Sequence, residues 1–238
     1  MQRLAHLIYP PQCLGCGTVV ADDFALCGPC WRETPFLGGL VCDSCGLPLP
    51  GEDDGTRPRC DDCLQIARPW GRGRAALLYA GTARKIILGF KHADRMEMAL
   101  PAARWMVRVG QPIFQPNMLV APIPLHWFRL LRRKYNQAAL LSAHVAKMCG
   151  FEHCPDLLIR PRRTPSQEGR GLSARFDNMQ GALHPHPRRV AQIAGRAVLL
   201  IDDVMTSGAT LAAAAEACNA AGAKSVSILV LARVAKDV

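Results

Sequence analysis

The segment that decides the fold is AVLLIDDVMTSGATL, which runs from Ala197 to Leu211. Its first residues, Ala197 to Ile201, are apolar without a polar break, which predicts a strand buried on both faces, as in a parallel sheet. Two carboxylates, Asp202 and Asp203, follow where the strand is expected to leave the sheet. A loop of small and hydroxyl residues then leads into an alanine-rich helix, Leu211 to Ala221. We therefore expect an α/β fold with a ligand site at the carboxyl end of this strand.

The loop after the acidic pair suits a phosphate monoester. Backbone N–H groups at a helix N-terminus bind anions, and the hydroxyls of Thr206, Ser207 and Thr210 add further donors. Gly208 lets the backbone approach a ligand closely, because glycine has no Cβ. The two carboxylates would repel a phosphate and instead suit neighbouring hydroxyl groups, such as those of a ribose. A phosphate pocket beside a diol pocket describes a ribose 5-phosphate.

The whole stretch resembles the signature with which type I phosphoribosyltransferases bind phosphoribosyl pyrophosphate (PRPP): a hydrophobic strand, two acids and then T-S/T-G-x-T. A buried strand with a capped helix would leave the acids and hydroxyls unexplained. The magnesium-binding strand of an ATPase also ends in acids, but it needs an upstream G-x-x-x-x-G-K-[ST], which this chain lacks. The resemblance makes Asp202 and Asp203 the candidate catalytic residues. The candidate phosphate-binding residues are Met205, Thr206, Ser207, Gly208, Ala209 and Thr210.

Eight of the eleven cysteines form four C-x-x-C pairs near the N-terminus. In a reducing compartment this pattern indicates metal binding, and eight thiolates match two tetrahedral Cys₄ zinc sites with a structural role. A redox dithiol would not explain four repeated pairs. Pairing the first with the second and the third with the fourth is favoured, and a cross-brace stays open. The candidate ligands are Cys13, Cys16, Cys27, Cys30, Cys42, Cys45, Cys60 and Cys63.

The net charge of +10 is unevenly distributed over the 238 residues. Residues 1–70 carry five arginines and nine acids, a net charge of −4, whereas residues 71–238 carry 24 basic residues and 10 acids, a net charge of +14. An anionic partner is therefore expected to meet the second part. We divide the chain accordingly into a double zinc ribbon (1–70) and a ligand-binding domain (71–238). The chain has no apolar run of about 20 residues and no signal-peptide pattern, so we expect a cytoplasmic protein without a membrane span.

Two basic segments are candidates for holding pyrophosphate. Arg129, Arg132, Arg133 and Lys134 fall within six positions, and they either line a solvated helix face or grip pyrophosphate. Residues 160–196 contain eight arginines and two acids, with scattered prolines and glycines. That composition predicts a mobile basic loop, which is either a lid over a polyphosphate site or a plain surface loop.

The order of these parts resembles the ComF family, also described as GntX-like proteins. The resemblance rests on the C-x-x-C pairs, on PIPLHWFRLLRRKYNQA, on the segment from Arg163 to Gly181 and on the signature itself. Lys134 departs from the family pattern, which has glycine there, and the spacing before Leu172 also differs. The resemblance assigns the pyrophosphate and lid roles to Arg129, Arg133, Asn136, Gln137, Thr164, Gln167 and Arg175.

The resemblance implies a type I phosphoribosyltransferase fold, a parallel sheet flanked by helices. It also implies Mg²⁺ with PRPP, or a related ribose 5-phosphate, and a link to DNA uptake in natural transformation. Two functions follow: a phosphoribosyltransferase of unnamed acceptor, and a non-catalytic competence factor that binds single-stranded DNA and works with DNA-uptake proteins. Because aromatic residues are few, the second function predicts modest base stacking and steep salt dependence.

Overall fold

A five-stranded parallel sheet in the order β1-β7-β6-β2-β3 forms the centre of the computed structural model, which describes residues 9–92, 95–162 and 171–235. The strands of this sheet are β1 (Arg72–Leu78), β2 (Leu119–Pro122), β3 (Glu152–His153), β6 (Ala197–Met205) and β7 (Ser225–Arg233). The short strands β4 (Leu158–Ile159) and β5 (His184–Pro185) pair antiparallel in a second sheet.

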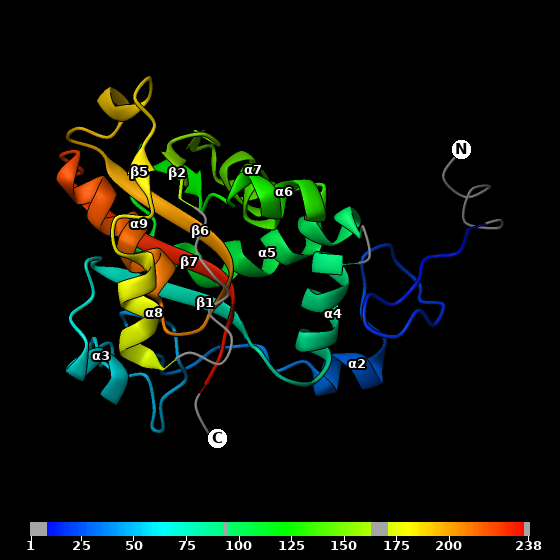
Figure 1. Cartoon of the computed structure of the whole chain (residues 1–238). Coiled ribbons are helices and arrows are strands. Elements are labelled where there is room, and N and C mark those ends of the chain that lie inside the picture. The colour runs from blue at the N-terminus through cyan, green and yellow to red at the C-terminus, as the bar shows by residue number, and fades with distance from the viewer. Residues whose placement is uncertain (1–8, 93–94, 163–170, 236–238) are drawn as a thin grey trace.

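Helices cover both faces of the parallel sheet (Figure 1). One face carries α4 (Gly81–His92), α5 (Ala99–Gly110) and α7 (Gln137–Cys149), and the other carries α8 (Leu172–Met179) and α9 (Ala209–Ala220). The remaining helices are α2 (Gly28–Glu33), α3 (Asp61–Gln65), α6 (Trp127–Arg133) and the 3₁₀ turns η1 (Met96–Met98), η2 (Gln111–Ile113) and η3 (Val190–Gln192). The predicted α/β fold with a helix-flanked parallel sheet is confirmed.

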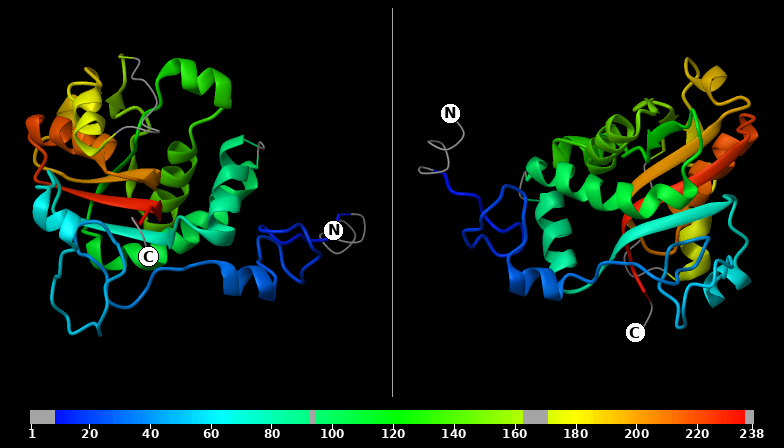
Figure 2. Two further views of the ribbon diagram at one scale, coloured as in Figure 1. Left: turned by 60° about the horizontal axis from the view of Figure 1, so that its bottom comes forward. Right: turned by 180° about the vertical axis from the view of Figure 1, so that it is seen from behind.

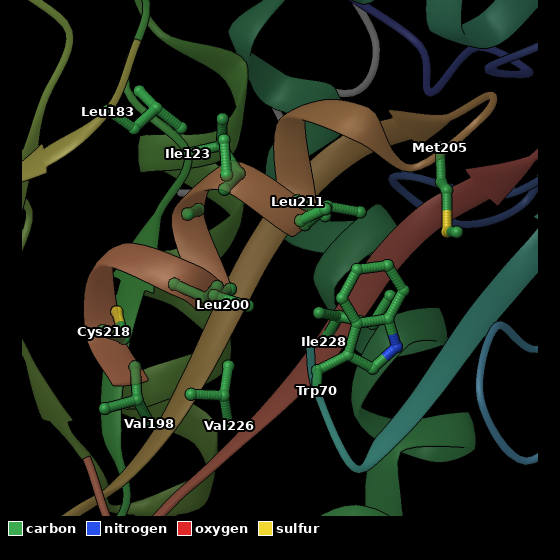
Figure 3. Packing of buried hydrophobic residues seen from close by; sticks show 14 of the residues in the cluster. Trp70, Ile123, Leu183, Val198, Leu200, Met205, Leu211, Cys218, Val226 and Ile228 are labelled. Atoms are coloured by element: carbon green, nitrogen blue, oxygen red, sulfur yellow. The ribbon is translucent and has the colours of Figure 1, made fainter. Parts of the chain in front are cut away.

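Strand β6 supplies side chains to the core on both sides of the sheet. Val198 and Leu200 belong to the cluster under α9, shown in Figure 3, whereas Leu199 and Ile201 belong to the cluster under α4, α5 and α7. This alternation follows from the two-residue period of a strand. The predicted burial of the strand on both faces is therefore confirmed.

The strand continues further than its apolar residues indicate. It runs to Met205, with Asp202 paired to Val230 of β7, so the acids lie inside the ladder and not beyond it. Helix α9 begins at Ala209, two residues before the predicted start. The apolar run of β7 extends to Ala232, and the backbone of β6 stays paired along it.

The basic segment 160–196 is more ordered than its composition predicts. Its described residues include α8, β5 and η3, and four of its apolar side chains lie in the core. These core residues are Met179, Ala182, Leu183 and Ile193. The expectation of a mobile loop across the whole segment was wrong, because widely spaced apolar residues anchor the described part of the chain between its arginines. Arg189, for example, forms an ion pair with Asp156 at 3.0 Å.

The cysteine-rich segment attaches to the rest of the molecule at two separate places (Figure 2). We call the part around Cys13–Cys30 ribbon 1 and the part around Cys42–Cys63 ribbon 2. Ribbon 1 inserts Leu14 into the cluster under α4, and the Leu14 carbonyl accepts a hydrogen bond from Arg95. Ribbon 2 joins the core cluster under α9 through all four of its cysteines.

Ribbon 2 is also fastened to strand β1 by polar contacts. Asp43 Oδ1 pairs with Arg72 Nη2 at 2.9 Å and with Arg74 Nη2 at 2.8 Å. Although burial raises the pKa of Asp43, the two guanidinium groups outweigh it and hold the pKa below its usual range. The Trp70 indole, which is buried in the same cluster as Met205 and Ile228 (Figure 3), donates to the Ser44 carbonyl at 2.7 Å.

In the ranges described, no helix combines the length and apolar character that crossing a bilayer requires.

In each ribbon, a glycine follows the second cysteine of the first C-x-x-C pair, and these two glycines provide a stability test. Gly17 and Gly46 both have positive φ, so alanine costs about 1–2 kcal/mol at either position. A Cβ at Gly46 would lie 2.5 Å from the Ala75 nitrogen, whereas nothing lies within 4 Å at Gly17. We expect Gly46→Ala to lower the free energy of urea unfolding by about 1–3 kcal/mol more than Gly17→Ala. Equal losses would contradict the packing of ribbon 2 on β1.

Candidate functional site

The eight paired cysteines form two separate four-sulfur clusters. Within each, the sulfurs lie within 4.8 Å of one another, and the favoured sequential pairing is confirmed. The Cys16–Cys27 and Cys45–Cys60 sulfur pairs are 3.7 Å and 3.6 Å apart. Tetrahedral zinc with Zn–S bonds of about 2.3 Å places its sulfurs about 3.8 Å apart. The clusters, Cys13/Cys16/Cys27/Cys30 and Cys42/Cys45/Cys60/Cys63, therefore fit two structural zinc ions.

Backbone N–H groups favour the thiolate form of Cys13 in ribbon 1. Cys13 Sγ accepts hydrogen bonds from the backbone nitrogens of Gly15 at 3.4 Å and Cys27 at 3.2 Å. Burial raises the pKa of the Cys13 thiol, but these hydrogen bonds outweigh it and lower the pKa to about 6. Zinc is bound by thiolates, so this environment suits a metal ligand.

The candidate catalytic pair lies near the carboxyl end of β6 and contacts α4. Lys91 Nζ lies 3.3 Å from Asp203 Oδ2, and Asp202 Oδ1 accepts a hydrogen bond from the Asp203 backbone at 2.9 Å. Burial and the adjacent Asp203 charge raise the pKa of Asp202 to about 8, against the opposing charges of Lys91 and Arg160. The pair therefore carries less than its full negative charge near neutral pH.

The start of α7 holds the end of α4 in place beside this pair. The Phe90 carbonyl accepts hydrogen bonds from Tyr135 Oη at 2.5 Å and from Gln137 Nε2 at 3.3 Å. Asn136 caps α7 through Oδ1 and donates from Nδ2 to the Ile123 carbonyl, just after β2. The side-chain amides of Asn136 and Gln137 thus connect the start of α7 to the end of β2 and to the end of α4, which carries Lys91. Direct pyrophosphate contacts by Asn136 and Gln137 remain a prediction.

The remaining pyrophosphate and lid candidates are less closely grouped. Arg133 ends α6 and donates to Gln137 Oε1 at 3.5 Å. Arg129 also lies on α6, but its side chain falls outside the described part, as do Thr164 and Gln167. Arg175 lies on α8.

The loop after β6 turns sharply into α9. Gly208 is the N-cap of α9 with φ +84°, a conformation that favours glycine. Ser207, Gly208 and Ala209 are buried, whereas Thr206 is exposed. A Cβ at Gly208 would lie 2.7 Å from Met205 Cε and 3.2 Å from the Trp70 ring. The glycine is therefore required by the fold of the chain itself, in addition to the ligand approach expected from the sequence.

Three cations close to the site carry no sequence signal. Lys91 pairs with Asp203, and Arg68 and Arg233 donate to carbonyl groups of the loop. Each is an isolated basic residue outside the signature, so only the fold brings it there. A fourth cation, Arg160, acts electrostatically on Asp202 and opens the basic segment 160–196.

Comparison with known proteins finds two family models on the chain. A double zinc ribbon domain matches residues 4–64, and a phosphoribosyl transferase domain matches residues 160–238. The DNA utilization protein YhgH of Escherichia coli K12 is 27% identical over 95% of this chain and 99% of its own length. Competence protein F of Haemophilus influenzae is 25% identical over 93% of this chain and 96% of its own.

Solved structures with partial likeness include two much longer enzymes. The allosteric regulatory enzyme of purine biosynthesis aligns with a TM-score of 0.41 and 14% identity, over 60% of this chain and 30% of that enzyme. The glutamine PRPP amidotransferase of Bacillus subtilis aligns with a TM-score of 0.40 and 15% identity, over the same shares. The chain thus spans less than a third of either enzyme.

The raised pKa of Asp202 predicts how stability depends on pH. Between about pH 4 and pH 8 the folded protein binds more protons at this group than the unfolded chain, so stability falls as pH rises. Asp202→Asn changes the unfolding free energy of the ligand-free protein. We expect this change to be more stabilising at pH 8.5 than at pH 5 by on the order of 1–3 kcal/mol. Urea unfolding at both pH values measures this difference. Asp177→Asn, which changes an exposed carboxyl, is the control. If the effect of Asp202→Asn does not depend on pH, the raised pKa of Asp202 is contradicted.

Proposed function

We propose that this chain, which belongs to the ComF family, binds a ribose 5-phosphate such as PRPP together with Mg²⁺ at the carboxyl end of β6, and that it serves DNA uptake. In this proposal residues 1–70 form the double zinc ribbon, and residues 71–238 form the phosphoribosyltransferase-like domain. One observation carries the proposal. The carboxyl pair lies near the end of β6, and the loop that follows this strand leads directly into the N-terminus of α9.

The loop from Thr206 to Thr210 supports binding of the 5′-phosphate. Arginine side chains donate to the carbonyls of Thr206 and Ser207, so the N–H groups in the same two peptide units, those of Ser207 and Gly208, point the other way. These N–H groups and the N-terminus of α9 then attract an anion. Met205 and Gly208 shape the turn beneath it.

The carboxyl pair supports binding of the ribose hydroxyls beside that phosphate. A protonated Asp202 can donate a hydrogen bond to a hydroxyl oxygen, and the carboxyl oxygens of Asp203 can accept one. Lys91 balances the pair in the absence of ligand. Mg²⁺, held mainly by pyrophosphate and ribose oxygens with these carboxylates nearby, would neutralise the polyphosphate charge.

The same site would serve transfer of the ribosyl group to a nitrogen nucleophile. A bond would form between the nitrogen and C1 of PRPP while the bond from C1 to the pyrophosphate oxygen breaks. Arg133 and the basic residues of segment 160–196 would stabilise the charge on the departing pyrophosphate.

A second candidate function, binding of single-stranded DNA, is favoured by the surface of α6. Trp127 is 62% exposed and Phe128 is 45% exposed, and three arginines share this helix with them. Exposed aromatic rings suit stacking on unpaired bases, and arginines on the same helix suit contact with the phosphate backbone. Relatives named for DNA utilization and competence support the same assignment.

Calorimetric titration of the zinc-loaded protein with PRPP tests the first function. We expect saturable binding that requires Mg²⁺ and falls at least tenfold, about 1.4 kcal/mol, in Asp202→Asn/Asp203→Asn. Asp177→Asn should bind like the wild type, since that carboxyl is exposed on α8. Unchanged PRPP affinity in the double variant would exclude this site.

Fluorescence titration with a labelled single-stranded oligonucleotide tests the second function. Replacing Trp127 and Phe128 by alanine should weaken binding roughly tenfold or more, as expected for loss of base stacking. Trp31→Ala removes a 52% exposed tryptophan from acidic ribbon 1 and should leave affinity unchanged. Affinity should fall steeply between 50 and 200 mM salt, and a nearly salt-independent affinity would rule this function out.

A further inference from the structure

Two arginines hold the carbonyl groups of the phosphate-binding loop. Arg233 Nη1 donates to the Thr206 carbonyl at 2.6 Å and lies 3.4 Å from the Met205 carbonyl. Arg68 Nη1 donates to the Ser207 carbonyl at 2.7 Å. The Arg233 residue is only 2% exposed, so its charge is buried beneath the loop. Because a trans peptide points its N–H away from its carbonyl, these contacts fix the direction of the N–H groups of the loop.

The same two arginines reach ribbon 2, Arg233 directly and Arg68 through Trp70. Arg233 Nη2 lies 3.8 Å from the Asp62 carboxylate, and Asp62 lies on α3 between two zinc ligands. Arg68 stacks over the Trp70 ring at 5.4 Å, and Trp70 in turn donates to the Ser44 carbonyl, again between two zinc ligands. Arg68 also packs closely against the loop, because a Cβ at Gly208 would lie 3.0 Å from Arg68 Nη1.

The charge of ribbon 2 suits these neighbours. Zinc with four thiolates has a formal charge of −2, and a buried guanidinium is stable only near compensating negative charge. Contacts around a metal site commonly orient both the ligands and the groups beyond them. Loss of this zinc would remove the negative charge of the metal site. It would also loosen the two C-x-x-C turns of ribbon 2, one of which contacts Arg233 and the other Trp70.

Ribbon 1 meets a different part of the molecule. Its described contacts run to α4 and Arg95, through Leu14, Gly15 and Glu33. Ribbon 1 therefore provides an internal comparison for ribbon 2.

We propose that Arg68 and Arg233 are positioning residues that tie the loop from Met205 to Gly208 to ribbon 2, so that phosphate binding depends on the zinc of ribbon 2 and not on that of ribbon 1. The affinity for ribose 5-phosphate is thereby linked to the metal content of one of the two ribbons. This inference rests on the proposed function of the loop, but the structural link between loop and ribbon can be measured separately.

The first test compares Cys60→Ser with Cys27→Ser in the full chain. Both cysteines are the third ligand of their cluster and the N-cap of the helix that follows, so the two changes are closely matched. Metal analysis should find one zinc per chain in each variant. We expect Cys60→Ser to weaken ribose 5-phosphate binding at least tenfold in calorimetry and Cys27→Ser to weaken it less than twofold. Equal effects, or none, would overturn the proposal.

The second test leaves both zinc sites intact, in case Cys60→Ser fails to fold. Arg68→Gln removes the donor to the Ser207 carbonyl, whereas Arg72→Gln breaks a contact between ribbon 2 and β1 that does not reach the loop. We expect Arg68→Gln to lower the affinity for ribose 5-phosphate about five- to tenfold, because one charged hydrogen bond is lost. The zinc content should stay unchanged. Arg72→Gln should bind like the wild type. If the two variants bind alike, Arg68 has no positioning role.

Amide hydrogen exchange separates this proposal from the proposed function. Exchange of the amides from Thr206 to Thr210 should accelerate in Arg68→Gln and Cys60→Ser without ligand, and should stay unchanged in Arg72→Gln and Cys27→Ser. If the wild type does not bind ribose 5-phosphate but this exchange pattern appears, the proposed function fails and the link stands. If the wild type binds and the exchange rates do not differ, the link fails alone.

Discussion

Two neighbouring carboxyl groups on a mostly buried strand impose the main constraint on this structure. Asp202 ionises there only with difficulty, because burial and the charge of the adjacent Asp203 raise its pKa. Lys91 supplies the closest cation. The end of α4 must therefore stay beside β6, and Tyr135 and Gln137 at the start of α7 hold it there. Three separate elements of the fold thus serve the electrostatic balance of one dipeptide.

Local patterns were enough to predict the elements that bear the site. The apolar run before Asp202, the hydroxyl loop and the C-x-x-C spacing are all short-range signals, and the strand, the helix and both cysteine clusters follow from them. Contacts between distant residues were not predictable in this way. Lys91, Arg68 and Arg233 are ordinary basic residues until the chain folds. Segment 160–196 was misjudged for a related reason, because charge content conceals the few apolar residues that anchor it.

One departure from the ComF pattern has a structural explanation. Lys134 is the C-cap of α6 with φ +65°, in the left-handed conformation that glycine adopts most easily. The family glycine thus corresponds to a turn that reverses the chain between α6 and α7, and the lysine makes the same turn at a cost of about 1–2 kcal/mol. After that turn, Asn136 caps the next helix.

The two ribbons also differ in how freely solvent reaches their sulfurs. All four cysteines of ribbon 2 are buried, whereas Cys16 of ribbon 1 is exposed and Cys27 is half-buried. Chelators and oxidants must reach a ligand before they can displace an ion, so accessible thiolates release metal faster. We therefore expect a zinc ion in ribbon 1 to be the more labile of the two. Under thiol oxidation it would be lost before a zinc ion held by the buried cysteines of ribbon 2.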